Sequence, residues 1–202
     1  MITIIDYGMG NLLSVSKAFE NLGFDTLVTQ KPEEVLNAKK VVFPGVGHFG
    51  KCMENLKKLK LLDSVRDVID KNVPFLGICV GLQQLFEKSE ESETEKGIAI
   101  FEGTVNKFKN RTKVPHMGWN QLNIVQDDCP LLKGITSDDY FYFTHSYYVD
   151  PSDKNIILSQ TDYEGEFVSA IWKGNVFATQ FHPEKSQDKG LKIIKNFGEY
   201  KA

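Results

Sequence analysis

The stretch Pro74-Phe75-Leu76-Gly77-Ile78-Cys79-Val80-Gly81 carries the most information about the fold. Residues 74–78 are apolar, as in a strand that is buried on both faces, and residues 80–86 continue with the spacing of an amphipathic helix. Between them stands Gly-x-Cys-x-Gly, the pattern of a nucleophile elbow with cysteine in the place of serine. Such a turn holds the central residue in a strained conformation, so its neighbours must be small. The stretch therefore predicts an α/β sheet that presents Cys79 at a strand end.

The alternative for Cys79 is a buried structural cysteine beside two ordinary glycines. The strand-then-helix context favours the reactive thiol, because a helix start offers free N–H groups and the positive end of a dipole. Both would stabilise a thiolate and a developing oxyanion. Cys52 and Cys129 have no glycine pair and are predicted to be spectators.

The first half of the chain has the pattern of βα units. We expect a strand at residues 2–5 and then a helix that Asn11 caps and Gly23 ends. The pattern predicts further strands at 24–28 and 40–43, and a helical region over 51–71 with a break near Leu61. Strands that alternate with helices imply a parallel sheet covered on both faces.

The second half is richer in strands. Extended segments are predicted at 104–109, 121–125, 140–144, 156–160, 167–172 and 176–181, the last two joined by a hairpin at Lys173-Gly174-Asn175, before a C-terminal helix. The acidic segment 87–96 is predicted to be a surface loop. Residues 1–202 are thus expected to form a single domain with a mixed sheet, parallel at its centre with antiparallel additions.

Composition limits the classes of partner. The 202 residues include 24 basic and 27 acidic side chains, for a net charge of −3 without a basic block, which argues against nucleic acid or an anionic membrane. We expect no signal peptide at residues 1–6 and no apolar run of the ~20 residues that a membrane span needs. Three cysteines without CxxC spacing indicate reduced thiols in a cytoplasmic protein, and neither a disulfide framework nor a zinc site.

A catalytic cysteine needs a histidine base, and the histidine needs an acceptor that orients it. His182 stands in Phe181-His182-Pro183-Glu184, directly after an apolar segment. Residues two apart on an extended chain point the same way, so Glu184 can approach His182. The alternative is a capped turn histidine. His48, His116 and His145 lack a carboxylate at fixed short spacing, although His145 stays a candidate for lining the site.

At this point the sequence resembles the class I glutamine amidotransferases over essentially its whole length. The motifs that carry the resemblance are Asp6-Tyr-Gly-Met-Gly-Asn11, Pro44-Gly-Val-Gly47, Gly77-Ile-Cys-Val-Gly-Leu-Gln83, Ser89-Glu-Glu91, His116-Met-Gly-Trp-Asn120, Phe143-Thr-His-Ser-Tyr147 and Gln180-Phe-His-Pro-Glu-Lys185. The first motif and His-x-Gly-Trp-Asn are similar to the branch of glutaminase subunits of imidazole glycerol phosphate synthase, in histidine biosynthesis. Departures are mild: Val80, Leu82 and His48 replace more usual residues.

The resemblance implies a flavodoxin-like fold and hydrolysis of L-glutamine through a cysteine thioester, without metal or organic cofactor. It implies a triad of Cys79, His182 and Glu184. By position in the motifs, it also implies oxyanion donors and residues that bind substrate. The donors would be the backbone N–H groups of Val80 and Val46, and the substrate would contact Gly45, Gly47, Gln83, Glu91, Ser146 and Tyr147.

The resemblance further implies a partner, a (β/α)₈-barrel cyclase that forms a heterodimer with the glutaminase and receives its ammonia. Asn11, Trp119, Tyr142 and Lys185 would lie near that interface. Other interpretations share the fold, and some of them the glutaminase chemistry. A paralogue could feed a partner that modifies surface sugars, and chorismate or pyridoxal phosphate synthases are served by similar subunits. A stand-alone γ-glutamyl hydrolase or a non-catalytic binding module of the same fold are further alternatives.

Overall fold

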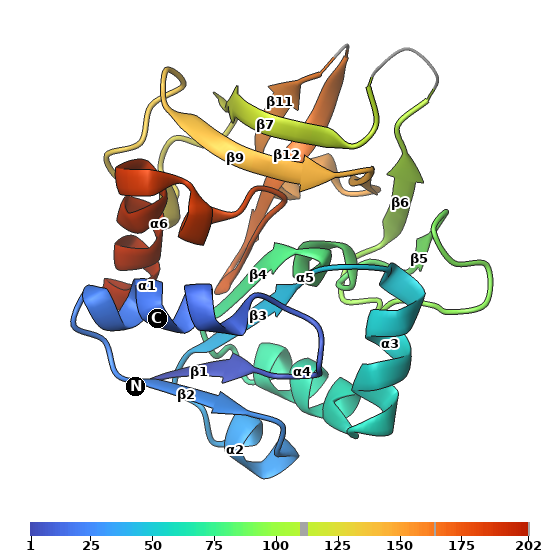
Figure 1. The fold of residues 1–202 in the computed structure, drawn as a ribbon, viewed down its shortest axis with the longest axis vertical. Coiled ribbons are helices and arrows are strands. Elements are labelled where there is room, and N and C mark those ends of the chain that lie inside the picture. The colour runs from blue at the N-terminus through green and yellow to red at the C-terminus, as the bar shows by residue number, and fades with distance from the viewer. Residues whose placement is uncertain (110–112, 164, 202) are drawn as a thin grey trace.

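The computed structural model describes residues 1–109, 113–163 and 165–201 (Figure 1). The first half consists of strands and helices in alternation. Its elements are β1 (Ile2–Ile5), α1 (Leu12–Asn21), β2 (Thr26–Thr29), α2 (Pro32–Leu36), β3 (Val41–Gly45), α3 (Phe49–Lys58), α4 (Leu61–Asp70) and β4 (Phe75–Cys79). The expected break between two helices is confirmed, since Lys60 has a left-handed backbone with φ 58° between α3 and α4.

The second half contains most of the strands. After the short helix α5 (Val80–Gln83), the strands are β5 (Lys88–Ser89), β6 (Gly103–Lys107), β7 (His116–Gln121), β8 (Asn123–Ile124), β9 (Tyr140–His145), β10 (Tyr147–Pro151), β11 (Ile157–Asp162), β12 (Glu166–Lys173) and β13 (Val176–Thr179). Three 3-10 turns (Pro130–Leu132, Lys154–Ile156, Pro183–Lys185) and the C-terminal helix α6 (Gln187–Glu199) complete the described chain.

One mixed sheet runs through the molecule, in the order β2-β1-β3-β4-β13-β12-β10-β6-β5. The strands from β2 to β13 are parallel, and β12 and β10 then continue antiparallel. The predicted architecture, with a parallel centre and antiparallel additions, is therefore confirmed. β7 and β9 pair separately as a two-stranded sheet, which lies above the carboxyl ends of the central strands in Figure 1.

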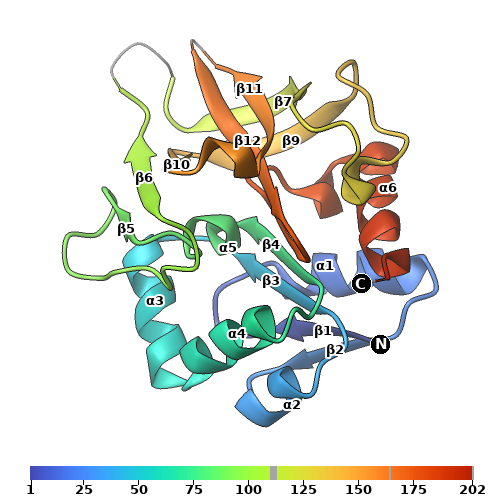
Figure 2. The ribbon, with the colours of Figure 1, turned by 180° about the vertical axis from the view of Figure 1, so that it is seen from behind.

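Helices cover both faces of the parallel strands. α1 lies in front of the sheet in Figure 1, whereas α2 and α4 lie in front in the view from behind (Figure 2). α1 buries Phe19 against Phe197 of α6, with ring centroids 6.3 Å apart. Every residue of β1, β3 and β4 is buried, as expected for strands between two helical layers. No helix in the described ranges is long and apolar enough to cross a membrane.

Two elements differ from the sequence-based expectation. α5 ends at Gln83 instead of Phe86, because the N–H groups of Leu85 and Phe86 donate three residues back, to Leu82 at 3.2 Å and Gln83 at 3.1 Å. The returning chain then uses the next carbonyl, since Ile98 N–H donates to Gln84 at 2.8 Å. The single strand expected at 121–125 is divided in the structure: β7, which pairs with β9, ends at Gln121, and β8 (Asn123–Ile124) pairs with β11 in the large sheet.

Candidate active site

Cys79 stands at the junction of β4 and α5 with φ 56° and ψ −110°. A non-glycine residue adopts positive φ only where the surroundings enforce it, at a cost of about 1–3 kcal/mol. β4 is enclosed by β3 and β13 on its two edges, so the strand cannot relax this turn. The backbone thus directs the thiol out of the sheet at its carboxyl edge.

The two glycines of the motif are required by close backbone approach. A Cβ added to Gly81 would lie 1.9 Å from the carbonyl oxygen of Phe43 in β3, a distance that no side chain can occupy. One added to Gly77 would lie 3.0 Å from the Cβ of Ala178 in β13. α5 is therefore packed against β3 by its backbone, which fixes where the helix begins relative to the sulfur.

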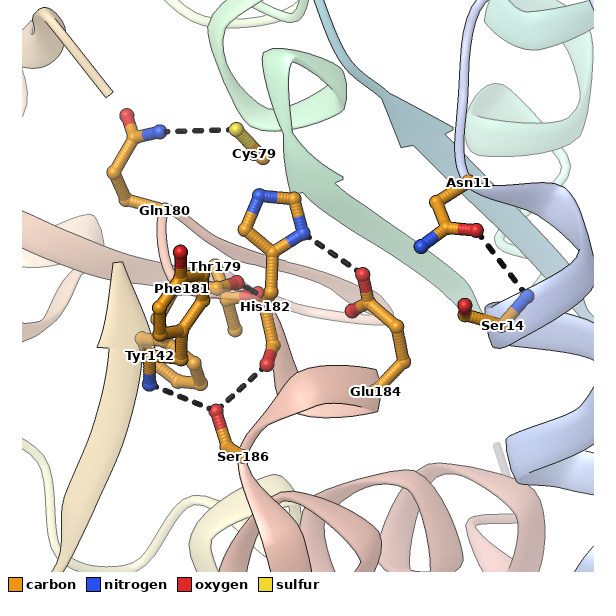
Figure 3. Close-up of polar contacts among 10 residues, drawn as sticks. All are labelled: Asn11, Ser14, Cys79, Tyr142, Thr179, Gln180, Phe181, His182, Glu184 and Ser186. Carbon is orange, nitrogen blue, oxygen red and sulfur yellow. Dashed lines mark hydrogen bonds and ion pairs between the residues drawn. The ribbon is translucent and has the colours of Figure 1, made fainter. Parts of the chain in front are cut away.

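His182 and Glu184 form a buried pair beyond the end of β13. The Nδ1 atom of His182 lies 2.8 Å from Oε1 of Glu184, and each side chain is 1% exposed. The second ring nitrogen, Nε2, points toward Cys79 in Figure 3 and has no hydrogen-bond partner among the described residues. The imidazole thus stands between the thiol and the carboxylate, as a base with an orienting group requires.

The charge state of the ring follows from these neighbours. Burial by itself would lower the pKa of His182, but the Cys79 thiolate and the Glu184 carboxylate outweigh it and raise that pKa to about 10. The protonated form of the ring is therefore favoured by both of its neighbours, the Cys79 sulfur on one side and the Glu184 carboxylate on the other.

A cavity of about 290 Å³ opens above the sulfur. Its walls come from the loop after β3, the β4–α5 turn, the segment after β5 and the β9–β10 connection. They are formed by Val46, Gly47, Cys79, Val80, Gln83, Glu91, Pro115, Thr144, His145, Ser146, Tyr147 and His182. A site of this size and polarity suits a small amino-acid ligand. Gly45 does not line the cavity, but it is the register partner of Cys79 across β3 and β4.

The candidate substrate-binding side chains are held in place by backbone groups. Gln83 Nε2 donates to the carbonyl oxygen of Tyr147 at 3.0 Å. Glu91 accepts a hydrogen bond from the Phe49 N–H, through Oε2 at 2.7 Å. Both contacts cross between elements far apart in sequence, so they fix the side chains relative to the cavity.

Gln180 lies at the sulfur, although no role was predicted for it. Its side chain is fully buried, and Nε2 lies 3.6 Å from Cys79 Sγ. It belongs to the motif that ends at Lys185, and its position two residues before His182 on an extended segment could have indicated it.

His145 lines the cavity, and His116 contacts it from β7. His116 Nδ1 lies 3.0 Å from His145 Nε2, and His145 Nδ1 lies 2.8 Å from the Tyr147 carbonyl oxygen. A carbonyl only accepts, so His145 Nδ1 carries a proton, and His116 Nδ1 then donates to the free His145 Nε2. Both neutral rings belong to one chain of hydrogen bonds that ends on the cavity wall.

The other two cysteines, Cys52 and Cys129, are free buried thiols. Burial raises the pKa of Cys52 and of Cys129 to about 12 in each case. Neither is ionised at neutral pH. Cys52 Sγ lies 3.7 Å from the carbonyl oxygen of Val46, so it packs beneath the loop that follows β3.

Three of the four candidate interface residues gather around one ring. The rings of Trp119 and Tyr142 meet edge to face with centroids 6.0 Å apart, and Lys185 Nζ lies 6.0 Å from the Tyr142 centroid. Asn11 is separate from them: it caps α1 by accepting from the Ser14 N–H at 3.4 Å. Figure 3 shows Asn11 and Tyr142 on opposite sides of the His182–Glu184 pair.

Comparison with known proteins agrees with this geometry. The model of the glutamine amidotransferase class-I family matches residues 3–199. A Methanocaldococcus jannaschii protein named imidazole glycerol phosphate synthase subunit HisH is 54% identical, over 98% of this chain and 99% of its own. An Aquifex aeolicus protein of the same name is 50% identical, over 96% of this chain and 94% of its own.

Solved structures share the fold at low sequence identity. The structure of PurLQS from Thermotoga maritima has a TM-score of 0.76 at 15% identity, over 97% of this chain and 96% of its own. A structure described as a glutamine amidotransferase also has a TM-score of 0.76, at 17% identity, over 98% of this chain and 100% of its own. The chain belongs to the class I glutamine amidotransferase family.

Proposed function

We propose that this chain is the glutaminase subunit of an imidazole glycerol phosphate synthase, acting as one domain over residues 1–202. It hydrolyses L-glutamine and passes the ammonia to a cyclase subunit in histidine biosynthesis. The observation that carries the proposal is the position of His182 Nε2: it is buried, points to Cys79 below a cavity, and has no hydrogen-bond partner in the described part of the chain. Glu184 orients the ring from its other nitrogen. Relatives that bear the name of this subunit match over nearly their full length.

The first half-reaction forms a thioester. The Cys79 thiolate attacks the carboxamide carbon of glutamine, and the electron pair of the C=O bond moves to its oxygen. When this oxyanion collapses, the C–N bond breaks and the His182 imidazolium gives its proton to the departing nitrogen. Ammonia, a γ-glutamyl thioester and a neutral imidazole result.

The second half-reaction consumes water. Neutral His182 takes a proton from a water molecule while the water oxygen attacks the thioester carbon. The C–S bond then breaks and the sulfur keeps the electron pair. Glutamate leaves, and the thiolate–imidazolium pair is restored. The sum is glutamine plus water giving glutamate plus ammonia.

Substrate is held by the walls of the cavity. We assign Glu91 to the α-ammonium group, because a carboxylate makes a charge-assisted hydrogen bond with it. The remaining contacts to the amino-acid head group and the carbonyl are assigned to Gln83, Ser146 and Tyr147, and to the backbone around Gly45 and Gly47.

We assign the hydrogen bonds that stabilise the oxyanion to the backbone N–H groups of Val80 and Val46. Val80 begins α5, where the first N–H groups have no partner within the helix. Val46 lies between two glycines, and Gly47 has φ 95°, so the peptide can turn without a steric clash. We infer that this donor is completed only on activation, and a missing donor raises the barrier by about 3–4 kcal/mol.

We assign the binding site for the partner to the surface around Tyr142. Trp119 is 45% exposed and Tyr140 is 52% exposed, unusual for large aromatic or apolar side chains. We propose that four residues, Trp119, Tyr142, Lys185 and Asn11, contact a (β/α)₈-barrel cyclase in a heterodimer. Nucleotide bound to that cyclase would raise glutaminase turnover through the interface.

The test is glutamine hydrolysis by the isolated chain, then with the cyclase, then with cyclase and its nucleotide ligand. We expect negligible turnover alone and stimulation of about two decades or more in the full assembly. Cys79→Ala should abolish both rates while the complex still forms in size-exclusion chromatography. Full turnover without a partner would contradict the assignment and favour a stand-alone hydrolase. Rescue of a histidine auxotroph separates this function from that of a sugar-modifying paralogue.

A further inference from the structure

Gln180 lies one residue beyond β13 and is enclosed on all sides. Its main-chain N–H donates to the Ser169 carbonyl at 2.8 Å, which fixes the backbone next to β12. Its side-chain amide extends toward the nucleophile, with Nε2 at 3.6 Å from Cys79 Sγ (Figure 3). A carboxamide this deeply buried must find partners for both of its ends.

The hydrogen-bond network assigns which end of the amide faces the sulfur. Gln83 Nε2 lies 3.0 Å from the Tyr147 carbonyl oxygen, which can only accept, so this atom is the amide nitrogen. The same nitrogen lies 3.0 Å from Gln180 Oε1 and donates its second proton there. The oxygen of Gln180 is thereby used, and its NH₂ group is directed at Cys79.

We propose that Gln180 is a further catalytic residue, whose side-chain amide donates a hydrogen bond to the Cys79 sulfur. The inference rests on the proposed thiol chemistry and adds a second donor to the one from His182. A hydrogen bond to the charged form favours that form, and sulfur accepts far better as thiolate than as thiol. Gln180 therefore stabilises the nucleophile before substrate arrives.

The same contact assists the second half-reaction. When the C–S bond of the thioester breaks, the sulfur leaves with the electron pair and needs a donor at that moment. By then His182 has taken the proton from water and is an imidazolium, so Gln180 gives the departing sulfur a second donor beside that ring. Gln180 is uncharged throughout and keeps its orientation, since Gln83 holds it from behind.

Other titratable groups surround the sulfur and have to be considered in a pH experiment. His182 and Glu184 face it from the segment after β13, and His145 and Glu91 line the same cavity. Tyr7 and Cys52 also interact electrostatically with Cys79, and burial raises the pKa of both well above their ordinary values. All of these groups are retained in the variants below.

The experiment measures the rate of Cys79 alkylation by iodoacetamide against pH, on the full chain without glutamine or partner. The modified residue is identified by mass spectrometry. In Gln180→Met, which keeps volume but has no donor, we expect the midpoint of the alkylation profile to rise by about one pH unit, a tenfold loss of thiolate on the acid side. Glutaminase assays are not involved, so failure here is distinguishable from failure of the proposed function.

Gln84→Met is the matched control. Gln84 is an equally buried glutamine, but its amide contacts Tyr7 Oη at 3.0 Å and Met53 Sδ at 3.5 Å, not the nucleophile. Its alkylation midpoint should equal that of the unmodified protein. If circular dichroism shows that Gln180→Met does not fold, Gln180→Asn is used instead. Its side chain is one methylene shorter, so its amide stays polar but no longer reaches the sulfur. An unmoved midpoint in a folded Gln180 variant, or an equal shift in Gln84→Met, overturns the proposal.

Discussion

The carboxylate of Glu91 accepts a hydrogen bond from the backbone N–H of Phe49, 2.7 Å away, at the first residue of α3. The opening N–H groups of a helix have no partner within it, so this contact satisfies one of them. Glu91 also lines the cavity, and its other carboxylate oxygen makes no hydrogen bond to another described residue. One acidic residue thus joins the start of α3 to the candidate substrate site.

Glu91→Gln is expected to raise KM for glutamine by about 10- to 100-fold, with a much smaller change in kcat. The amide oxygen can still accept from Phe49, but the charge that pairs with the substrate α-ammonium is lost, and such bonds contribute about 1.5–3 kcal/mol. Steady-state kinetics of the assembled enzyme test this. Glu90→Gln is the control, because Glu90 accepts from Lys107 N–H at 2.6 Å on the surface and does not line the cavity. Equal KM values in both variants would contradict the role of Glu91.

Gly81→Ala is expected to destabilise the fold by about 3 kcal/mol or more. The new Cβ would lie 1.9 Å from the Phe43 carbonyl oxygen, so α5 would have to separate from β3. Gly77→Ala should cost less, because its nearest contacts are at 3.0 Å and above, within reach of small adjustments. Urea unfolding of the two variants measures the difference. Similar losses in both would show that backbone approach at Gly81 does not control this turn.

The fold was predictable where the spacing of apolar residues agrees with nearby capping and turn residues. The strand at Ile2–Ile5 and the helix capped by Asn11 follow from short patterns that need no distant partner. β10 (Tyr147–Pro151) was missed although its backbone is extended, because it directly follows β9 and carries no turn signal. Its pairing with β6, forty residues earlier in the chain, is a tertiary effect that local propensity does not contain.

The candidate site, too, was predictable only in part from local sequence. Cys79, His182 and Glu184 stand out because two of them are separated by one residue and the third lies in a glycine turn. The roles of Gln180 and of the His116–His145 contact depend on pairs 101 and 29 residues apart. Such juxtapositions arise from strand order, and no spacing in the sequence encodes them.

Glu184→Gln is expected to lower kcat by about two decades or more while KM changes little. The substitution keeps the shape of the side chain but removes the charge that stabilises the His182 imidazolium at 2.8 Å. With that support gone, the pKa of His182 falls from about 10. The pH–rate profile should therefore lose its basic side at lower pH than in the unmodified protein. A profile of unchanged shape would mean that Glu184 only fills space.

His116 and His145 give stability a pH dependence below neutrality. Burial lowers the pKa of His116 to about 4 and that of His145 to about 3. Between these values and the ordinary value of about 6.5, the unfolded chain binds protons that the folded chain does not. The contribution of these two residues to stability is therefore full above pH 6.5 and falls as the pH falls toward 4. His182 does not oppose this trend, because its raised pKa keeps it protonated in both states over that range.

His116→Phe is expected to make this acid-side loss shallower by up to about 1.4 kcal/mol per pH unit, the contribution of one titrating group. The phenyl ring can keep the stacking that His116 makes with Tyr163, whose centroid is 3.9 Å away, but it cannot bind a proton. Urea unfolding at intervals from pH 4 to 7 gives the slope. His48→Asn is the matched control, because His48 is an exposed N-cap of α3 and Asn caps equally well, so its slope should match the unmodified protein. If His116→Phe and His48→Asn give the same slope, the buried pair does not couple protonation to folding.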